Sequence, residues 1–228
     1  MKRRDFLQQT GLGLAAIGIT GCVLRSDAMP TRGTAEADAS EMPFGTFPTP
    51  SGGDADLKLT VSRQLGPFYR SGSPYRAKLT PPYEPGPVLV VTGTVWSFET
   101  KKPLPNVLLD LWQVDSQTAT YSNGSGDFKN RARLMTDENG AYEFETVHPV
   151  PYSPGPNFWR SPHVHFIATV PGHKKLVSEM FFVGDPKQDI DSLFHPSLSV
   201  PAVKKRVNGK EYETAVFDIV LEAEKSGK

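Results

Sequence analysis

The strongest constraint on the fold is a succession of short runs rich in β-branched and aromatic residues, without helical periodicity longer than about two turns. The runs cover residues 88–96, 107–114, 141–147, 164–170, 176–183 and 215–221. Turn-forming segments separate most of them, such as Lys-Pro-Leu-Pro-Asn at 102–106 and Asp-Glu-Asn-Gly at 137–140. A parallel α/β sheet is excluded because no crossover helices are present. We expect an all-β fold, an antiparallel β-sandwich with long Pro-rich loops, and at most one or two short helices, at 201–207 and 190–194.

The N-terminus is typical of an export signal. Arg3 and Arg4 precede an apolar run at 11–19, which is the pattern of a twin-arginine signal and is shorter than the ~20 residues that a membrane helix needs. Ile-Thr-Gly-Cys at 19–22 resembles the lipobox of bacterial lipoproteins. Cys22 is the only cysteine, so an internal disulfide is excluded and lipidation is expected there. The chain is then predicted to be anchored in the cell envelope, periplasmic or on the outer surface, with Cys22 as its only membrane attachment.

The composition predicts one domain behind a tether. We assign residues 1–22 to the signal with its lipobox, 23–56 to a disordered tether rich in small and polar residues, and 57–228 to a single β-sandwich domain. Without residues 1–21, 22 basic and 24 acidic side chains remain of the 25 of each in the whole chain. This near-neutral balance argues against a nucleic-acid partner.

Two histidines form the first candidate site. His163 and His165 open a strand-like run, and residues i and i+2 of a strand point to the same face, about 6.5 to 7 Å apart at the backbone. One metal ion can bridge that gap, although two histidines on an exposed strand face can also be simply solvated. Two tyrosines, Tyr121 and Tyr152, lie in neighbouring loops, where a lone tyrosine is more often an anchor at the edge of a core. The other three histidines lie in contexts that favour surface or loop roles: His148, His173 and His195.

Several motifs in order along the chain carry a family resemblance. They are Leu-Gly-Pro-Phe-Tyr at 65–69, Leu-Asp-Leu-Trp-Gln at 109–113, Thr-Asp at 136–137 with Gly-Ala-Tyr at 140–142, Pro-Tyr at 151–152, Trp-Arg-Ser-Pro-His-Val-His-Phe at 159–166 and Phe-Phe-Val-Gly-Asp-Pro at 181–186. These blocks resemble successive blocks of the intradiol ring-cleavage dioxygenases, which include protocatechuate 3,4-dioxygenase and catechol 1,2-dioxygenase. The resemblance covers residues 60–222.

The resemblance implies a metal centre and a reaction. In that family two tyrosinates and two histidines hold a mononuclear iron(III), and the matching positions are Tyr121, Tyr152, His163 and His165, with one ion per chain. Iron(III) is a hard cation that prefers anionic oxygen and can lower a phenol's pKa from about 10 far enough for phenolate to bind. The implied substrates are a catechol-type ring and O2, and the product is a muconate-type diacid. Neither a reductant nor an organic cofactor is implied, and homo-oligomerisation stays open.

The resemblance also assigns catalytic residues. Tyr152 matches the tyrosinate that the substrate displaces and that accepts a substrate proton, and Arg160 matches an arginine that stabilises negative charge on the ring. One departure stands out, because Glu179-Met180-Phe181 replaces the Gln-Leu-Tyr that is common in the protocatechuate enzymes. A carboxylate there would repel a catecholate unless it is protonated or paired, and Arg160 is the suggested partner. The ring substituents of the substrate therefore stay open.

Two alternatives to a dioxygenase remain at this point. The turn motifs at 93–95, 105–107 and 136–144 also resemble small exported β-sandwich modules that bind partners or space domains. Such modules have no reason to carry two tyrosines and a His-X-His pair, which favours the enzyme. A hydrolase with another metal at the same histidines is disfavoured because no carboxylate base is evident beside them in the sequence.

Overall fold

The computed structural model describes residues 56–117, 119–121 and 128–225. The predicted signal with Cys22 and nearly all of the predicted tether lie outside the described residues, so these assignments stay predictions. Within the described ranges no helix has the length and hydropathy needed to cross a lipid bilayer.

The described residues form strands and one short 3-10 helix. In chain order these are β1 (Val88–Ser97), β2 (Leu108–Trp112), β3 (Arg131–Met135), β4 (Ala141–Val147), β5 (Tyr152–Gly155), β6 (Phe158–Arg160), β7 (His163–Thr169), β8 (Leu176–Phe182), η2 (Pro196–Leu198), β9 (Ser199–Val200), β10 (Val203–Val207), β11 (Lys210–Val216) and β12 (Ile219–Leu221). The predicted all-β class is confirmed, and five of the six predicted runs lie on β1, β2, β4, β7 and β8.

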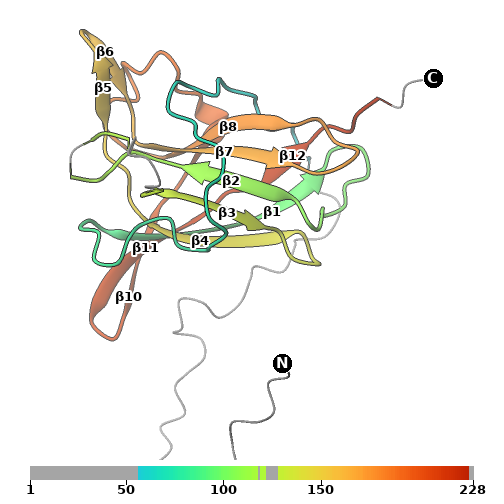
Figure 1. Cartoon of the computed structure of the whole chain (residues 1–228), viewed down its shortest axis with the longest axis horizontal. Coiled ribbons are helices and arrows are strands. Elements are labelled where there is room, and N and C mark those ends of the chain that lie inside the picture. The colour runs from blue at the N-terminus through green and yellow to red at the C-terminus, as the bar shows by residue number, and fades with distance from the viewer. Residues whose placement is uncertain (1–55, 118, 122–127, 226–228) are drawn as a thin grey trace, which may run out of the picture. The chain divides into compact units, whose positions relative to one another are not determined.

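Two five-stranded sheets form the sandwich (Figure 1). In the first sheet β1 pairs with β4 on one side and with β11 and β12 on the other, and β10 follows β11. The second sheet has the order β3-β2-β7-β8-β9, and β5 and β6 form a separate hairpin. Most pairs are antiparallel as predicted, but β1 pairs in parallel with β11 and β12, and β8 with β9. These parallel pairs do not follow helical crossovers, because the intervening chain returns through other strands and loops.

The main core lies between the two sheets. It takes Val91 and Val95 from the first sheet and Leu111 and Phe166 from the second, all fully buried. In β7 the residues that face this core are Val164, Phe166 and Ala168, whereas His163 and His165 alternate with them and point to the opposite, outer face. The core therefore fixes which face of the second sheet the two histidines occupy.

One glycine allows β1 to be paired along its whole length. The predicted run 215–221 is interrupted at Phe217 and Asp218, between the end of β11 and the start of β12. A Cβ on Gly93 would lie 2.1 Å from the carbonyl oxygen of Phe217, and the Thr94 N–H donates to the Asp218 carboxylate at 2.8 Å. The close backbone approach at this bulge thus requires glycine.

The prediction of a helical turn at 201–207 is wrong. Residues Val203–Val207 form β10, an exposed edge strand that pairs with β11. The two strands are joined by Asn208 and Gly209, which both have positive φ, 48° and 77°. Asn-Gly with this geometry is a preferred two-residue hairpin turn, so the local turn chemistry favours strands on both sides. Residues 190–194 form a series of turns.

Two elements cover the outer face of the second sheet. The first is the N-terminal arm, residues 57–78, whose backbone bonds β8 through the Arg63 N–H to the Val177 carbonyl at 2.7 Å. The second is the β5–β6 hairpin, which stands at one end of the sandwich in Figure 1. A second cluster of buried side chains forms beneath them, with Trp112, Tyr121 and Tyr152 as its largest members. The predicted site residues meet in this second cluster.

Candidate metal centre

The strand register places two aromatic side chains and one carboxylate next to the histidine pair. His165 lies opposite Trp112 of β2 and opposite Glu179 of β8, and His163 lies opposite Phe181. The Trp112 and His165 rings stack with a centroid distance of 4.8 Å and an interplanar angle of 5°. On the arm, a Cβ at Gly66, whose φ is +72°, would lie 3.7 Å from Cε1 of His165. The imidazole of His165 is thus held between the Trp112 indole and the backbone of the arm.

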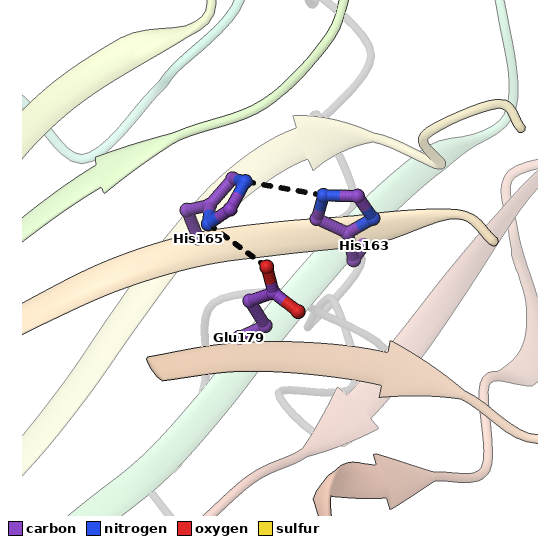
Figure 2. A group of neighbouring side chains, drawn as sticks. All are labelled: His163, His165 and Glu179. Atoms are coloured by element: carbon purple, nitrogen blue, oxygen red, sulfur yellow. Dashed lines mark hydrogen bonds and ion pairs between the residues drawn. The ribbon is translucent and has the colours of Figure 1, made fainter. Parts of the chain in front are cut away.

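The two imidazoles turn one nitrogen each toward the other (Figure 2). Their Nε2 atoms are 3.2 Å apart. Nδ1 of His163 lies 2.6 Å from the carbonyl oxygen of Ser161, which can only accept, so this nitrogen carries the proton. Nδ1 of His165 lies 3.3 Å from Oε1 of Glu179, a long contact to another acceptor. Both Nε2 atoms are then unprotonated acceptors that face each other, an arrangement that a cation between them would satisfy.

Tyr121 and Tyr152 converge on the same point from different elements. Tyr121 follows a loop closed by the bond from the Asp115 N–H to the Thr120 carbonyl at 2.7 Å. Tyr152 begins β5 and lies opposite Arg160 of β6. The two phenol rings are 5.6 Å apart at their centroids, Tyr121 is 6.3 Å from His165, and Tyr152 is 5.7 Å from His163. The structure therefore brings together all four side chains that the sequence predicted as metal ligands.

Tyr121 is packed between an aromatic ring and a guanidinium. Its ring stacks on Phe68 of the arm at 4.3 Å and lies 6.0 Å from the guanidinium of Arg131. Its hydroxyl is buried next to the Tyr152 phenol, but no hydrogen-bond geometry links it to Tyr152 or to another described residue. Burial, followed by the nearby Tyr152 phenol, raises the pKa of Tyr121 well above 10, and burial also raises the pKa of Tyr152. Without a cation both phenols are therefore neutral.

The protonation states of the four groups fit a cation. Burial, followed by the positive Arg160, lowers the pKa of His163 to about 3, and burial also lowers the pKa of His165 well below 6.5. Neutral imidazoles with free lone pairs are ligands for transition metals, and an unpartnered buried hydroxyl gains a partner by binding one. Two phenols and two imidazoles suit a hard trivalent cation such as iron(III) better than zinc, which favours thiolate, imidazole and carboxylate.

Arg160 lies in a buried network of charges. Its Nη2 donates to Oε2 of Glu179 at 2.7 Å, and its Nε donates to both carboxylate oxygens of Asp191 at 3.2 Å. Glu179 is therefore paired with Arg160, the partner that was expected from the sequence. Although burial lowers it, the pKa of Arg160 is raised overall by the two carboxylates, so the guanidinium is charged. Its charge also acts on the phenols, since it opposes the increase in the pKa of Tyr152.

One premise of the sequence analysis is corrected here. A carboxylate does lie beside the histidines, because cross-strand pairing brings Glu179 to His165. His163, His165 and Glu179 are close enough together to suggest a three-residue metal site. However, Glu179 contacts Nδ1 of His165, whereas His163 faces Nε2 on the other side of the same ring (Figure 2). The lone pairs of one imidazole diverge, so Glu179 cannot share an ion with both Nε2 atoms, and its bond to Arg160 argues against a role as free base.

The remaining histidines lie away from this site. His148 bridges Glu213 at 2.6 Å and Asp185 at 2.9 Å, and His195 accepts the N–H of Ser197 at the start of η2. Sequence reasoning missed several residues that shape the centre, namely Phe68, Trp112, Arg131 and Asp191. Phe68 and Trp112 lie within the family motifs, but nothing local in the sequence indicates which rings they touch.

A cavity of about 560 Å³ borders the centre on the side of Glu179. Its lining consists of Ser62, Arg63, Gln64, Glu179, Ser192 and Leu193. None of the four predicted ligands belongs to this lining, so we place the chemistry at the converging rings and not in this cavity.

Comparisons with known proteins agree with this geometry. A family model described as Dioxygenase matches residues 66–223. Chlorocatechol 1,2-dioxygenase of Rhodococcus opacus is 28% identical over 187 residues, which cover 72% of each protein. Catechol 1,2-dioxygenase 2 of Acinetobacter lwoffii is 31% identical over 169 residues, 66% of this chain and 61% of that protein. The crystal structure of 3-chlorocatechol 1,2-dioxygenase from Rhodococcus opacus 1CP matches with a TM-score of 0.67 and 26% identity, over 72% of this chain and 73% of that one. Since the family match extends over most of the chain and these relatives are catechol-type dioxygenases, the chain belongs to the intradiol ring-cleavage dioxygenase family.

Proposed function

We propose that this chain binds one iron(III) ion and uses O2 to cleave a catechol-type ring between its two hydroxylated carbons, giving a muconate-type diacid. The observation that carries the proposal is the meeting of two phenols and two imidazoles from three segments of the chain at one buried point. We assign Tyr121, Tyr152, His163 and His165 as the ligands. Family membership supports the reaction class, and the ring substituents stay open.

Iron(III) would supply a Lewis-acidic centre that binds the catechol-type substrate and makes its ring reactive toward O2, and Tyr121, Tyr152, His163 and His165 would hold it. The protein's part is to hold the substrate beside the buried ligand rings and to take its protons. Tyr121, fixed between Phe68 and Arg131, is suited to remain in place. Tyr152 starts a short hairpin strand whose next residues, Ser153 and Pro154, are exposed, so it is the phenol that can turn away and accept a substrate proton.

Arg160 is proposed to stabilise negative charge on the ring during attack by O2. Its guanidinium is buried beside Tyr152, where water competes little with its charge. Its Nε and Nη2 are engaged by carboxylates, which fixes the plane of the group. The effect on the substrate therefore comes from a charge of fixed position.

We further propose that the enzyme is exported by the twin-arginine route and anchored through acylated Cys22. The support is the order of features near the N-terminus: a twin arginine comes first, then a short apolar run, and then Cys22 at the end of the lipobox. Metabolic labelling with a fatty acid tests the anchor, and Cys22→Ser should abolish the label while leaving the domain folded.

Purified protein tests the proposed reaction directly. The expected result is about one iron per chain, a visible tyrosinate-to-iron absorption band that shifts when catechol is added, and uptake of one O2 per ring opened. Product analysis should show cleavage between the hydroxylated carbons. A colourless protein without iron, even after reconstitution under mild conditions, contradicts the proposal and favours a non-catalytic exported module.

A further inference from the structure

We propose that Glu179 is a positioning residue that fixes the tautomer and ring orientation of His165 and makes the two histidines of the centre unequal as electron donors. The inference rests on the proposed iron centre. It concerns a carboxylate at a position where the protocatechuate enzymes commonly carry an amide, and it assigns that carboxylate a role toward a metal ligand instead of toward the substrate.

The two oxygens of Glu179 meet two different donors. Oε2 accepts from Nη2 of Arg160 at 2.7 Å, and Oε1 lies 3.3 Å from Nδ1 of His165. The 3.3 Å contact lacks hydrogen-bond geometry, and Nδ1 of His165 has no hydrogen-bond partner among the described residues, so the adjacent carboxylate of Glu179 is an acceptor toward which this nitrogen can turn its proton. Glu179 and His165 are both 2% exposed, so water does not replace this acceptor. The contact thus sets which nitrogen of His165 carries the proton.

The carboxylate of Glu179 is itself held by a chain of bonds. Arg160 lies between Glu179 and Asp191, and Asp191 accepts the backbone N–H groups of Ser161 and Leu193, each at 2.9 Å. The chain therefore runs from the backbone through two ion pairs to His165. Such a path leaves Glu179 little freedom to turn away from the imidazole.

A carboxylate fits this place better than an amide does. Glutamine has one acceptor oxygen and one NH2 group, and both neighbours of residue 179 are donors. If the amide oxygen turned to Arg160, the NH2 group would face the N–H of His165. If it turned to His165, a buried guanidinium N–H would face the NH2 group. Only a carboxylate, in which both oxygens are acceptors, can face the donors of Arg160 and His165 at the same time.

The two histidines therefore have different partners. Nδ1 of His163 lies 2.6 Å from the neutral carbonyl of Ser161, whereas Nδ1 of His165 faces a negative carboxylate. A carboxylate partner raises the basicity of a metal-bound imidazole more than a carbonyl does. His165 is thus the stronger donor of the pair, and an iron ion bound there would be less electron-poor than one with two carbonyl-supported histidines.

The test compares Glu179→Gln with wild type on reconstituted protein. Iron affinity is measured by chelator competition, and the tyrosinate-to-iron band by absorption spectroscopy. The expected result for Glu179→Gln is an affinity about 10- to 100-fold weaker, the usual cost of losing the partner of a metal-bound histidine, and a band at longer wavelength. Glu213→Gln is the matched control, because Glu213 also contacts a histidine nitrogen, that of His148 at 2.6 Å, but away from the centre. The control should keep wild-type affinity and band.

A double variant separates positioning from folding. Thermal unfolding of the metal-free proteins shows whether Glu179→Gln folds, since it leaves Arg160 without one of its charge partners. In Glu179→Gln/Arg160→Gln, the amide of residue 179 can turn its oxygen to His165 and its NH2 group to the oxygen of residue 160. We expect part of the iron affinity to return, while the band stays at longer wavelength because the acceptor is neutral.

The outcomes are distinguishable from failure of the proposed function. If wild type binds no iron, the function fails. If wild type binds iron, and Glu179→Gln and the double variant both keep the wild-type affinity and band, the role of Glu179 is refuted. A folded double variant that recovers no affinity refutes the matching of donors and acceptors.

Discussion

Replacing Tyr121 by phenylalanine should act in opposite directions on the metal-free and the iron-loaded protein. The Tyr121 ring is tightly packed against Phe68, and phenylalanine keeps that ring while it removes only the hydroxyl. In the metal-free structure this hydroxyl is buried without a hydrogen-bond partner among the described residues. An unsatisfied buried polar group costs about 1 to 3 kcal/mol, so its removal should stabilise the metal-free fold by about that amount.

The predicted gain can be measured by thermal unfolding in the presence of a chelator. For a domain of this size 1 kcal/mol corresponds to about 2 to 4 °C, so the melting temperature of metal-free Tyr121→Phe should rise by at least about 2 °C. In the iron-loaded protein the same substitution should be unfavourable, because it removes an anionic ligand. Losing the hydrogen-bond partner of a ligand costs about 10- to 100-fold in metal affinity, and losing the ligand itself should cost more.

Phe68→Leu serves as a control, because it loosens the same stack without removing a proposed ligand. It should lower the stability of the metal-free protein and keep the visible band. Two results would refute the reasoning. An unchanged band in Tyr121→Phe would mean that Tyr121 is not a ligand, because loss of one of two tyrosinate ligands should weaken and shift the band. A lower melting temperature in the metal-free state would mean that the hydroxyl is bonded, for example to Tyr152, and is not the orphan that the geometry indicates.

Three further predictions follow from other parts of the fold. His163→Ala should abolish iron binding and colour, measured by metal analysis and absorption, whereas His195→Ala, at the exposed start of η2, should leave both unchanged. Burial lowers the pKa of His148, but its two carboxylate partners raise it overall above 6.5. The stability from this cluster is therefore complete below pH 6.5 and is lost as pH rises through the folded pKa, so denaturant unfolding should show a larger deficit of His148→Gln at about pH 5.5 than at about pH 9. Gly93→Ala should destabilise the domain by about 3 kcal/mol or more, because the new Cβ would collide with the Phe217 carbonyl at 2.1 Å, and near-wild-type unfolding would contradict the proposed bulge.

The strands were predictable where the pattern is local. The β-branched and aromatic content of β1, β4, β7 and β8 marks these elements, and the alternation within β4 reappears in its burial, whereas both faces of β1, β7 and β8 are largely buried. The strand β10 was missed although Asn208 and Gly209 form a strong hairpin signal just after it. The parallel pairings of β1 were not predictable, since they depend on long connections and not on local pattern.

The site was predictable to different depths. The side-by-side placement of His163 and His165 follows from strand geometry alone. The tyrosines came from the family resemblance, because Tyr121 and Tyr152 lie 31 positions apart on separate loops and meet only through tertiary packing. Glu179 was noticed as a departure, but its contact with His165 depends on the register between β7 and β8, which the sequence does not reveal.

The covering elements, more than the strand that carries the histidines, make this face of the sheet a site. A His-X-His pair on the outer face of a sandwich would by itself be solvated, with imidazoles of ordinary pKa. Here His163 and His165 are each 2% exposed, because the arm brings Gly66 against His165 and the β5–β6 hairpin brings Tyr152 beside His163, with Phe68 of the arm packed on Tyr152. That cover lowers the pKa of both imidazoles and removes the water that would otherwise satisfy them. The same strand thus supplies the main core with one face and a reactive centre with the other, and the choice between a solvated and a metal-binding pair is made by segments far away in the sequence.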